Sequence, residues 1–135
     1  MTASENKKLM QHIFGELAQG NSRPLVENMA DDFQWTVAGS SKWSGAFRGR
    51  DAVLNQLLAP LRAQIEGRIK TVPLRFIAED DHVVVEARGN NTTKAGNPYN
   101  NSYCFVVRLA GGKLAEITEY MDTELVSSVL ADPAA

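Results

Sequence analysis

Cysteine and histidine are scarce in this sequence, which has one cysteine and two histidines among 135 residues. The single cysteine, Cys104, excludes an intrachain disulfide and a thiolate metal cluster. Neither His12 nor His82 has a second histidine at ligand spacing, so we expect no metal site. The glycine patterns that bind phosphates or dinucleotides are missing, and no serine lies in a nucleophile-elbow motif. We therefore expect a protein that works without a cofactor.

Long apolar runs and an excess of basic charge are missing as well. No segment approaches about 18 consecutive apolar residues, so we expect no membrane-spanning helix. The polar residues 1–10 do not have the pattern of a signal peptide. The 14 Lys and Arg residues against 16 Asp and Glu residues give a formal net charge of −2, which argues against nucleic-acid binding. We expect no membrane or nucleic-acid partner and a cytoplasmic location.

Length and composition fit one globular domain. The 135 residues fall within the common domain size of roughly 100–150 residues. The hydrophobic fraction of 44% and the charged fraction of 22% are close to globular averages. A chain of this size can bury a core without disulfides. We expect a single domain over residues 1–135, with its core at about residues 5–130.

The first part of the chain carries helical patterns. Thr2 and Glu5 have the spacing of a capping box. Apolar residues recur at helical spacing over residues 9–18, so a first helix is predicted there. Ser22 and Pro24 mark the beginning of a second, short helix.

A strand and a third helix are predicted next. Apolar residues alternate with polar ones over residues 33–37, which indicates a strand. Residues 38–49 are rich in glycine and serine and predict a loop. Asp51 begins a helix, and its acidic side chain suits the helix dipole. Because Pro60 lies inside this helical pattern, we expect a kink or a break at that residue.

The second half of the chain predicts an antiparallel meander. Four segments are rich in β-branched and aromatic residues, and clusters of turn residues separate them. The predicted strands span residues 68–78, 82–93, 99–109 and 113–122. Three helices followed by such a sheet indicate an α+β fold with the helices packed on one sheet face.

Alternation along these strands suggests which side chains meet, because every second residue of a strand points to the same face. If the polar and aromatic faces all point the same way, they form one concave surface with Trp35 at its wall, as in a small-molecule pocket. The residues of this surface would be Glu86, Arg88, Asn101, Tyr103, Tyr120 and Asp122. The alternative is that this face is solvated and that Glu86 and Arg88 form an ordinary surface pair.

Asp122 is the residue that the pattern favours for acid–base chemistry. It follows an apolar and aromatic stretch at a strand end, where a carboxyl group could act as an acid or a base. The alternative is that Asp122 caps a C-terminal helix beginning at Thr123. Cys104, between Tyr103 and Phe105, is expected to be a buried and inert thiol.

Several motifs are similar to those of one known family. They include the run ADDFQWTV, the segment FRGRDAV and the terminal strand EYMDT. The similar segments are residues 30–37, 43–45, 47–53, 83–89, 96–103, 112–117 and 119–123. On these segments the chain resembles the SnoaL-like, ketosteroid-isomerase-related family of the nuclear transport factor two-like superfamily. The resemblance covers about residues 5–130.

The resemblance implies a cone-shaped α+β fold of the cystatin-like barrel type. In such a cone, a curved, mixed and mainly antiparallel sheet wraps around a mostly apolar pocket that the N-terminal helices close. Many members form dimers through the outer face of the sheet, so a homodimer is expected. Members include steroid isomerases, polyketide cyclases, epoxide hydrolases, dehydratases and non-catalytic binding modules, so the fold alone does not assign an activity.

The catalytic residues of these family members can be compared one by one with the residues at the matching positions of this sequence, and the match differs between the activities. A standard ketosteroid isomerase is not expected, because none of the residues near its three catalytic positions can replace them. These residues are Ile13, Val37 and Cys104. The terminal-strand aspartate of the epoxide hydrolases matches Asp122, whereas their central arginine–aspartate pair falls on Glu86 and Arg88 in reversed order. The acid or base of the polyketide cyclases would also match Asp122.

We therefore expect a small-molecule pocket protein, acting as a cofactor-independent isomerase, cyclase or hydrolase on an apolar or polycyclic ligand. Asp122 would be the acid or base, and Tyr103 or Tyr120 would polarise an oxygen. Glu86 and Arg88 would tune the charge. The ligand would contact Trp35, Tyr120, Asn101 and Phe105.

The alternative is a non-catalytic ligand-binding or dimerisation module of the same fold. The two functions predict different interiors. A cavity larger than about 300 Å³ with convergent polar groups favours a ligand site. An interior filled by Trp35, Tyr103 and Phe105 favours a structural module.

Overall fold

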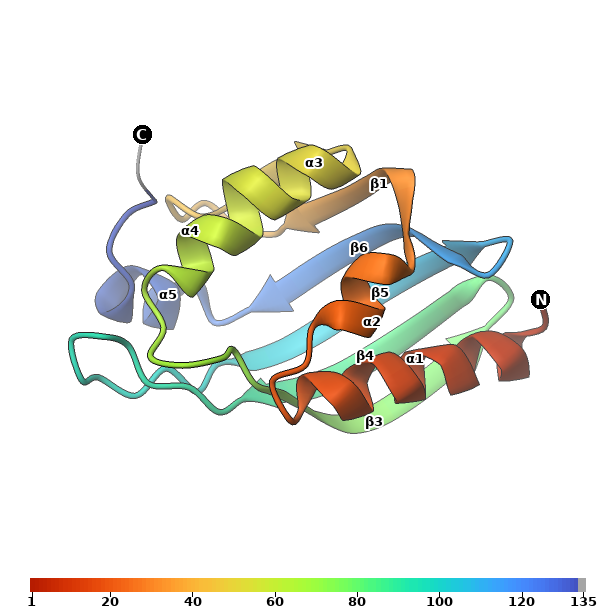
Figure 1. Ribbon diagram of the computed structural model, residues 1–135, viewed down its shortest axis with the longest axis horizontal. Coiled ribbons are helices and arrows are strands. Elements are labelled where there is room, and N and C mark those ends of the chain that lie inside the picture. The colour runs from red at the N-terminus through yellow and green to blue at the C-terminus, as the bar shows by residue number, and fades with distance from the viewer. Residues whose placement is uncertain (134–135) are drawn as a thin grey trace.

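One curved sheet of six strands forms the body of the molecule (Figure 1). The computed structural model describes residues 1–133, so the last two residues of the expected domain lie outside the described range. The strand order across the sheet is β2-β1-β6-β5-β4-β3. The strands are β1 (Met29–Val37), β2 (Gly45–Arg48), β3 (Thr71–Glu79), β4 (His82–Gly89), β5 (Ser102–Ala110) and β6 (Lys113–Met121).

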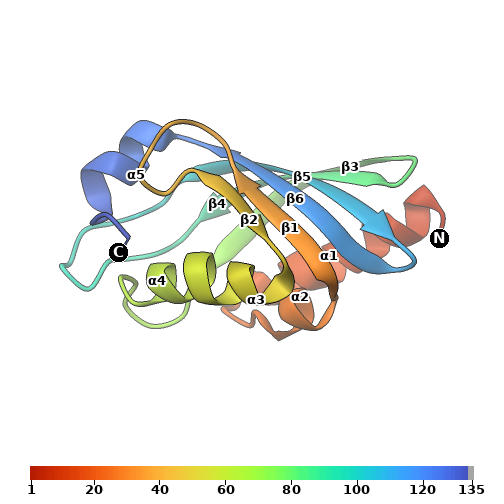
Figure 2. The same cartoon turned by 90° about the horizontal axis from the view of Figure 1, so that it is seen from above.

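Helices cover one face of this sheet and leave the other face open. Figure 2 shows the sheet arching over α1 to α4, while α5 lies at one end. The helical segments are α1 (Ala3–Leu17), α2 (Arg23–Glu27), α3 (Arg50–Ala52), the π-helix η1 (Val53–Leu58), α4 (Ala59–Arg62) and α5 (Thr123–Val129). This arrangement is the α+β cone that the resemblance implied, and the predicted fold class is confirmed.

The first helix begins as its capping pattern predicts. The Thr2 hydroxyl accepts a hydrogen bond from the Glu5 amide at 3.1 Å, and the Thr2 amide donates to Glu5 Oε1 at 3.0 Å. These two bonds satisfy amide groups that a helix start otherwise leaves free. Met10, Ile13 and Phe14 form the buried side of α1, which packs on the concave face of the sheet.

The predicted interruption at Pro60 does not occur. The chain stays helical through α3, η1 and α4, and Pro60 lies in the first turn of α4. The irregular part is instead the π-helical turn from Val53 to Leu58. A helix tolerates proline in its first turn, because the amide groups there have no carbonyl partner within the helix and the missing N–H breaks no hydrogen bond. A shift to π-helical bonding just before Pro60 is consistent with this.

The meander of the second half is present, and a further strand pair joins it to the first half. β3, β4, β5 and β6 pair in antiparallel order, while β1 pairs with β6 in parallel, so the sheet is mixed. The loop predicted over residues 38–49 was wrong in part, because β2 lies within it and pairs with the end of β1. β2 is a short, mostly exposed edge strand, and such a strand has no apolar alternation to reveal it.

The register of the strands decides which side chains face the helices. Val85 pairs with Phe105, and Phe105 pairs with Glu119, so these three residues share the concave face. Glu86 pairs with Cys104, which pairs in turn with Tyr120 on the outer face. Cys104 is half-buried there, so the expectation of a fully buried thiol is corrected.

No helix within residues 1–133 is long and apolar enough to cross a membrane.

Candidate functional site

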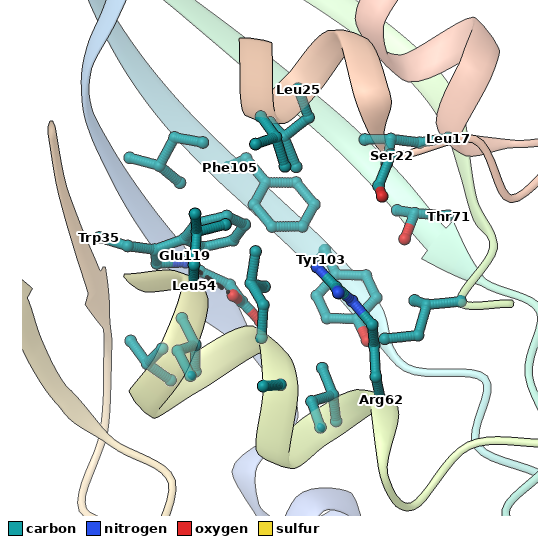
Figure 3. A pocket seen from close by; sticks show the side chains of 18 of the residues that line it. Leu17, Ser22, Leu25, Trp35, Leu54, Arg62, Thr71, Tyr103, Phe105 and Glu119 are labelled. Atoms are coloured by element: carbon teal, nitrogen blue, oxygen red, sulfur yellow. Dashed lines mark hydrogen bonds between the residues drawn. The ribbon is translucent and has the colours of Figure 1, made fainter. Parts of the chain in front are cut away.

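A cavity of about 680 Å³ lies between the concave face of the sheet and the helices (Figure 3). It is lined mainly by apolar side chains from α1, α2, β1, η1, α4, β5 and β6. Trp35, Tyr103 and Phe105 form part of its wall and do not fill it. The volume is well above the lower limit of about 300 Å³ for small-molecule sites. The interior therefore has the size of a ligand site.

Aromatic rings form a continuous wall on the sheet side of the cavity. The ring of Phe105 stacks on that of Tyr103 at a centroid distance of 5.2 Å. It meets Trp35 edge to face at 6.2 Å and the ring of Phe14 at 5.4 Å. Such offset and edge contacts are the preferred geometries of aromatic pairs, and they hold the rings in fixed positions. The wall is therefore a preformed surface for a flat or apolar ligand.

One carboxyl group, that of Glu119, lies within this apolar wall. Glu119 is on β6 between Ile117 and Met121 of the same strand face, and all three residues line the cavity. The indole nitrogen of Trp35 donates a hydrogen bond to Glu119 Oε1 at 2.9 Å. No donor within residues 1–133 bonds the other oxygen, Oε2, which is therefore available to a ligand.

The protein surrounding Glu119 changes its acidity. Burial disfavours the charged form and raises the pKa of Glu119 from 4.5 to about 7, although the hydrogen bond from Trp35 acts in the opposite direction. The surface that Glu119 still exposes faces the cavity. At neutral pH the group is consequently present in both its protonated and its ionised form. A group with this balance can give or take a proton with little cost.

Two tyrosines near Glu119 supply hydroxyl groups to the same cavity. Tyr99, which precedes β5, is buried, and its hydroxyl oxygen accepts a hydrogen bond from Asn101 Nδ2 at 3.2 Å. Tyr103, on β5, supplies the second hydroxyl group and lines the same cavity. Burial, together with the nearby Glu119 carboxylate, raises the pKa of Tyr99 and raises that of Tyr103 well above its usual range. Both hydroxyl groups therefore stay protonated and can donate.

Asn101 connects these tyrosines to the end of the neighbouring strand. Its side chain is fully buried, Nδ2 donates to the Asp122 carbonyl at 3.1 Å, and Oδ1 accepts from the Asp122 amide at 3.0 Å. Asn101 was predicted to contact the ligand, but it does not line the cavity. It lies behind Tyr99 and holds the tyrosine hydroxyl in place.

The structure places Asp122 at the start of α5. Its carboxylate Oδ1 accepts from the amides of Glu124 at 3.1 Å and Leu125 at 3.2 Å. These are the bonds of a helix N-cap, which was the alternative interpretation of this residue. Asp122 is not among the residues that line the cavity, so its carboxyl group does not converge with Trp35, Tyr103 and Phe105.

Three other predicted residues lie on the outer face of the sheet. Glu86 forms a surface ion pair with Arg75 at 3.3 Å, and Arg88 pairs in register with Val72 on the same face. Tyr120 is 51% exposed. The predicted concave surface containing Glu86, Arg88 and Tyr120 was therefore wrong. The apolar side chains that alternate with these residues are the ones that point inward, because the interior buries apolar surface.

Glu119 and Tyr99 were missed by the sequence analysis. A signal for Glu119 is present, because the alternating positions Ile117 and Met121 put it on an otherwise apolar strand face. The parity of β4 is a second signal, since Val83, Val85 and Ala87 make one face wholly apolar. Tyr99 lies before its strand begins, where alternation carries no information about direction.

Metal-binding groups are not gathered at this site or elsewhere in the described part of the chain. Residues 1–133 contain no group of three or more His, Cys, Asp or Glu side chains placed to hold a metal ion. The polar groups of the aromatic wall are the Glu119 carboxyl, the Trp35 indole N–H and the hydroxyls of Tyr99 and Tyr103, and further polar side chains from the helices and β3 complete the lining.

Comparison with known sequences identifies one domain type over most of the chain. Residues 10–117 match the sequence profile described as the SnoaL-like domain. No curated protein sequence matches the chain.

Solved structures share the fold over nearly the full chain. An NTF2-like protein from Burkholderia xenovorans LB400 is 24% identical, with a TM-score of 0.76 over 97% of this chain and 99% of its own. Bal32a from a soil-derived mobile gene cassette is 21% identical, with a TM-score of 0.81 over 96% and 98%. TerC, co-crystallised with polyporic acid, is 18% identical, with a TM-score of 0.77 over 92% and 96%. At these identities the likeness extends to the fold alone.

Proposed function

The chain belongs to the SnoaL-like domain family, and from its cavity we propose that it is a cofactor-independent enzyme. It would move a proton on an apolar or polycyclic ligand, as isomerases, cyclases and some hydrolases do. The observation that carries this proposal is a carboxyl group with a pKa of about 7, Glu119, at the wall of an otherwise apolar cavity. This residue replaces Asp122 in the role of acid or base.

Glu119 has the two properties that a general acid or base needs. Its pKa lies near neutral pH. At that pH a large fraction of the group is ionised and can act as a base, and the ionised group is still basic enough to take a proton from the ligand. The Trp35 N–H fixes Oε1, so the free Oε2 is the oxygen that would meet the ligand. A carboxyl group held in this way does not have to reorganise before the proton moves.

The tyrosine pair would stabilise the negative charge that proton removal leaves on the ligand. Tyr103 and Tyr99 remain protonated, and both line the cavity with Glu119. Tyr99 accepts a hydrogen bond from Asn101, so its own proton is free to be donated. A hydroxyl that accepts such bonds becomes a stronger donor. An enolate or phenolate oxygen is the kind of group that would be bound here.

The cavity walls support an apolar and flat ligand. Phe105, Tyr103 and Trp35 present ring faces and edges, and the volume of about 680 Å³ accommodates several fused rings. TerC, which has the same fold, was co-crystallised with polyporic acid. Polyporic acid and flat polycyclic ketones are therefore the first ligands to test.

A probe reaction tests the proposed chemistry before the natural substrate is identified. In 5-nitrobenzisoxazole, a base removes the ring C–H proton, the C–H electrons form a nitrile, and the N–O bond breaks to release a coloured phenolate. Glu119 would take the proton and pass it to water. We expect turnover that increases as pH rises through about 7, following the ionised form of Glu119.

Two variants decide whether Glu119 performs this reaction. Glu119→Gln keeps the shape but cannot take a proton, so the rate should fall by about 100-fold or more. Glu116→Gln is the matched control, because Glu116 is on the same strand but pairs with Arg108 at 3.8 Å outside the cavity. Equal rates in Glu119→Gln and the native protein would contradict the proposal. Binding of the probe without turnover would favour the non-catalytic binding module.

A further inference from the structure

The cavity lining includes exposed charged side chains, which mark its mouth. The less exposed Glu119 lies within the apolar wall, beside the aromatic rings. Three arginines, Arg23, Arg62 and Arg68, belong to the lining as well. The chain as a whole carries a formal net charge of −2, so this gathering of cations does not follow from its composition.

Two of these arginines have unpaired charges. Arg23 forms an ion pair with Glu27 at 2.9 Å, and both residues line the cavity, so their charges compensate each other. Arg62 and Arg68 form no ion pair with any residue in the range 1–133. The mouth therefore carries two uncompensated positive charges within the described part of the chain.

Both unpaired arginines contribute to the cavity lining. Figure 3 shows Arg62 leaving the end of α4 and extending across the cavity in front of Tyr103. The stem of Arg68 packs on Gly20, where an added Cβ would lie 2.8 Å from Arg68 Cβ. Gly20 also has a positive φ of 85°, so glycine is favoured at this position on two grounds. The close approach keeps the Arg68 stem against the helical side of the mouth.

Hydroxyl groups lie beside these arginines. Ser22 and Thr71 line the cavity, and Figure 3 shows both hydroxyl groups among the lining side chains. Among residues 1–133, neither hydroxyl has a hydrogen-bond partner that would hold it elsewhere. Guanidinium and hydroxyl groups can all donate hydrogen bonds, and a planar guanidinium matches a carboxylate in two bonds.

We propose that Arg62 and Arg68 select a ligand with a carboxylate at one end and an apolar ring system at the other. The carboxylate would lie at the mouth, between the two guanidinium groups and the hydroxyls of Ser22 and Thr71. The ring system would lie along Phe105 and Tyr103, with its reacting carbon next to Glu119. This assignment names the substrate class of the proposed enzyme and rests on that proposed function.

An organic cation is the competing ligand that the same cavity could attract. Aromatic rings and a carboxylate recognise alkylammonium groups through cation–π and ionic contacts. Such a cation would have to pass the two unpaired arginines at the mouth, which repel it. An anion is attracted at the mouth and keeps its charge away from Glu119. The distribution of charge therefore favours the carboxylate.

Three naphthalene probes of nearly equal size separate these possibilities. Isothermal titration calorimetry would compare 2-naphthoate, 2-naphthamide and 2-naphthylmethylammonium at low ionic strength. We expect 2-naphthoate to bind roughly ten-fold more tightly than the amide, as charge-assisted hydrogen bonds allow. Arg62→Gln and Arg68→Gln should each reduce this preference, and the double variant should remove it. The double variant with Arg23→Gln and Glu27→Gln is the matched control at the same mouth and should keep the preference, because it removes a compensated pair and leaves the local charge unchanged.

The outcomes distinguish this proposal from the enzymatic one, because binding is measured without turnover. Equal affinity for naphthoate and naphthamide, or tighter binding of the ammonium probe, would overturn the carboxylate assignment and leave the acid–base proposal standing. Loss of preference in the Arg23 and Glu27 double variant, with no loss in the Arg62 and Arg68 variants, would also overturn it. If none of the three probes bound, the apolar ligand site itself, and both proposals with it, would be contradicted.

Discussion

At the scale of single residues, one carboxyl group in an apolar wall is the basis of the proposed chemistry. Glu119 is held by one hydrogen bond from Trp35 and is otherwise surrounded by apolar groups and the cavity. Burial outweighs that bond, so the pKa of Glu119 is about 7 instead of 4.5. A protein that needed only stability would have an apolar residue here. The carboxyl group therefore has a cost to folding, which can be measured.

The first prediction concerns stability against pH. The pKa of Glu119 is higher in the folded than in the unfolded state. The folded protein therefore holds this proton more tightly, which stabilises it fully below pH 4.5. The stabilisation is lost as pH rises to about 7. Relative to Glu119→Gln, the native protein should lose up to about 3 kcal/mol of unfolding free energy over this interval. Urea unfolding at several pH values measures the difference.

Glu116→Gln provides the control for this series. Glu116 is on the outer face of β6, about 40% exposed beside Arg108, so its removal should leave the pH dependence close to that of the native protein. Native and Glu119→Gln curves that stay parallel from pH 4.5 to pH 7 would contradict the raised pKa of Glu119.

The second prediction concerns the hydrogen bond from Trp35. This bond lowers the pKa of Glu119, so Trp35→Phe should raise that pKa above 7 and move the rise of the pH–rate profile to higher pH. Trp43→Phe is the matched control, since Trp43 also lines the cavity but donates to the Ala131 carbonyl at 3.0 Å. A profile that moves to lower pH in Trp35→Phe would be inconsistent with a stabilised carboxylate.

At the scale of elements, the end of β6 and the start of α5 hold the tyrosines in place. Asn101 bonds both the amide and the carbonyl of Asp122 and donates to Tyr99. The Asp122 side chain points the other way and caps α5. The Asp122 backbone therefore anchors Asn101, and the Asp122 side chain caps α5. Neither role places its carboxylate in the cavity.

The third prediction separates capping from catalysis at Asp122. Asn is as good an N-cap as Asp, so Asp122→Asn should change neither stability nor the rate of the probe reaction. Asp122→Ala should destabilise the protein by about 1 kcal/mol through loss of the cap, again with an unchanged rate for the folded protein. Thermal unfolding and the benzisoxazole assay measure the two effects. A large loss of rate in Asp122→Asn with normal stability would restore Asp122 as the acid or base.

The helices and strands were largely predictable from the sequence, whereas the side of each strand that points into the cavity was not. The capping box at Thr2 and the apolar spacing that follows it are local signals, and α1 forms as they predict. The four strands of the meander follow from their turns and β-branched residues. Alternation assigns residues to two faces but not to inside or outside. The inside face of β4 and β6 is the apolar one, and Glu119 is its exception.

At the scale of the whole molecule, the sheet has one covered and one open face. The helices α1 to α4 close the cavity on the concave side, and no helix of residues 1–133 lies over the middle of the outer face (Figure 2). Ile77 and Tyr120 are 53% and 51% exposed on that outer face. A homodimer through the sheet, which the resemblance implies, would cover these side chains.

The fourth prediction tests this homodimer. Sedimentation velocity at micromolar concentration should give twice the mass of one chain for the native protein. Ile77→Glu replaces an exposed apolar side chain of the outer face with a charge and should give the monomer mass, with the circular dichroism spectrum unchanged. Asp80→Asn in the turn that follows β3 is a control outside the face. A monomeric native protein, or a dimer that persists in Ile77→Glu, would contradict the expected interface.

The most direct test of the account is the ionisation of Glu119 itself. Carbon-13 NMR of protein labelled at the glutamate carboxyl carbons follows each group through a pH titration, and Glu119→Gln identifies the signal by its loss. We predict one glutamate with a midpoint near pH 7. Addition of an apolar carboxylate such as 2-naphthoate should move that signal, because the ligand enters the same cavity. A Glu119 midpoint near 4.5 would contradict the account, because the group would then be an ordinary carboxylate.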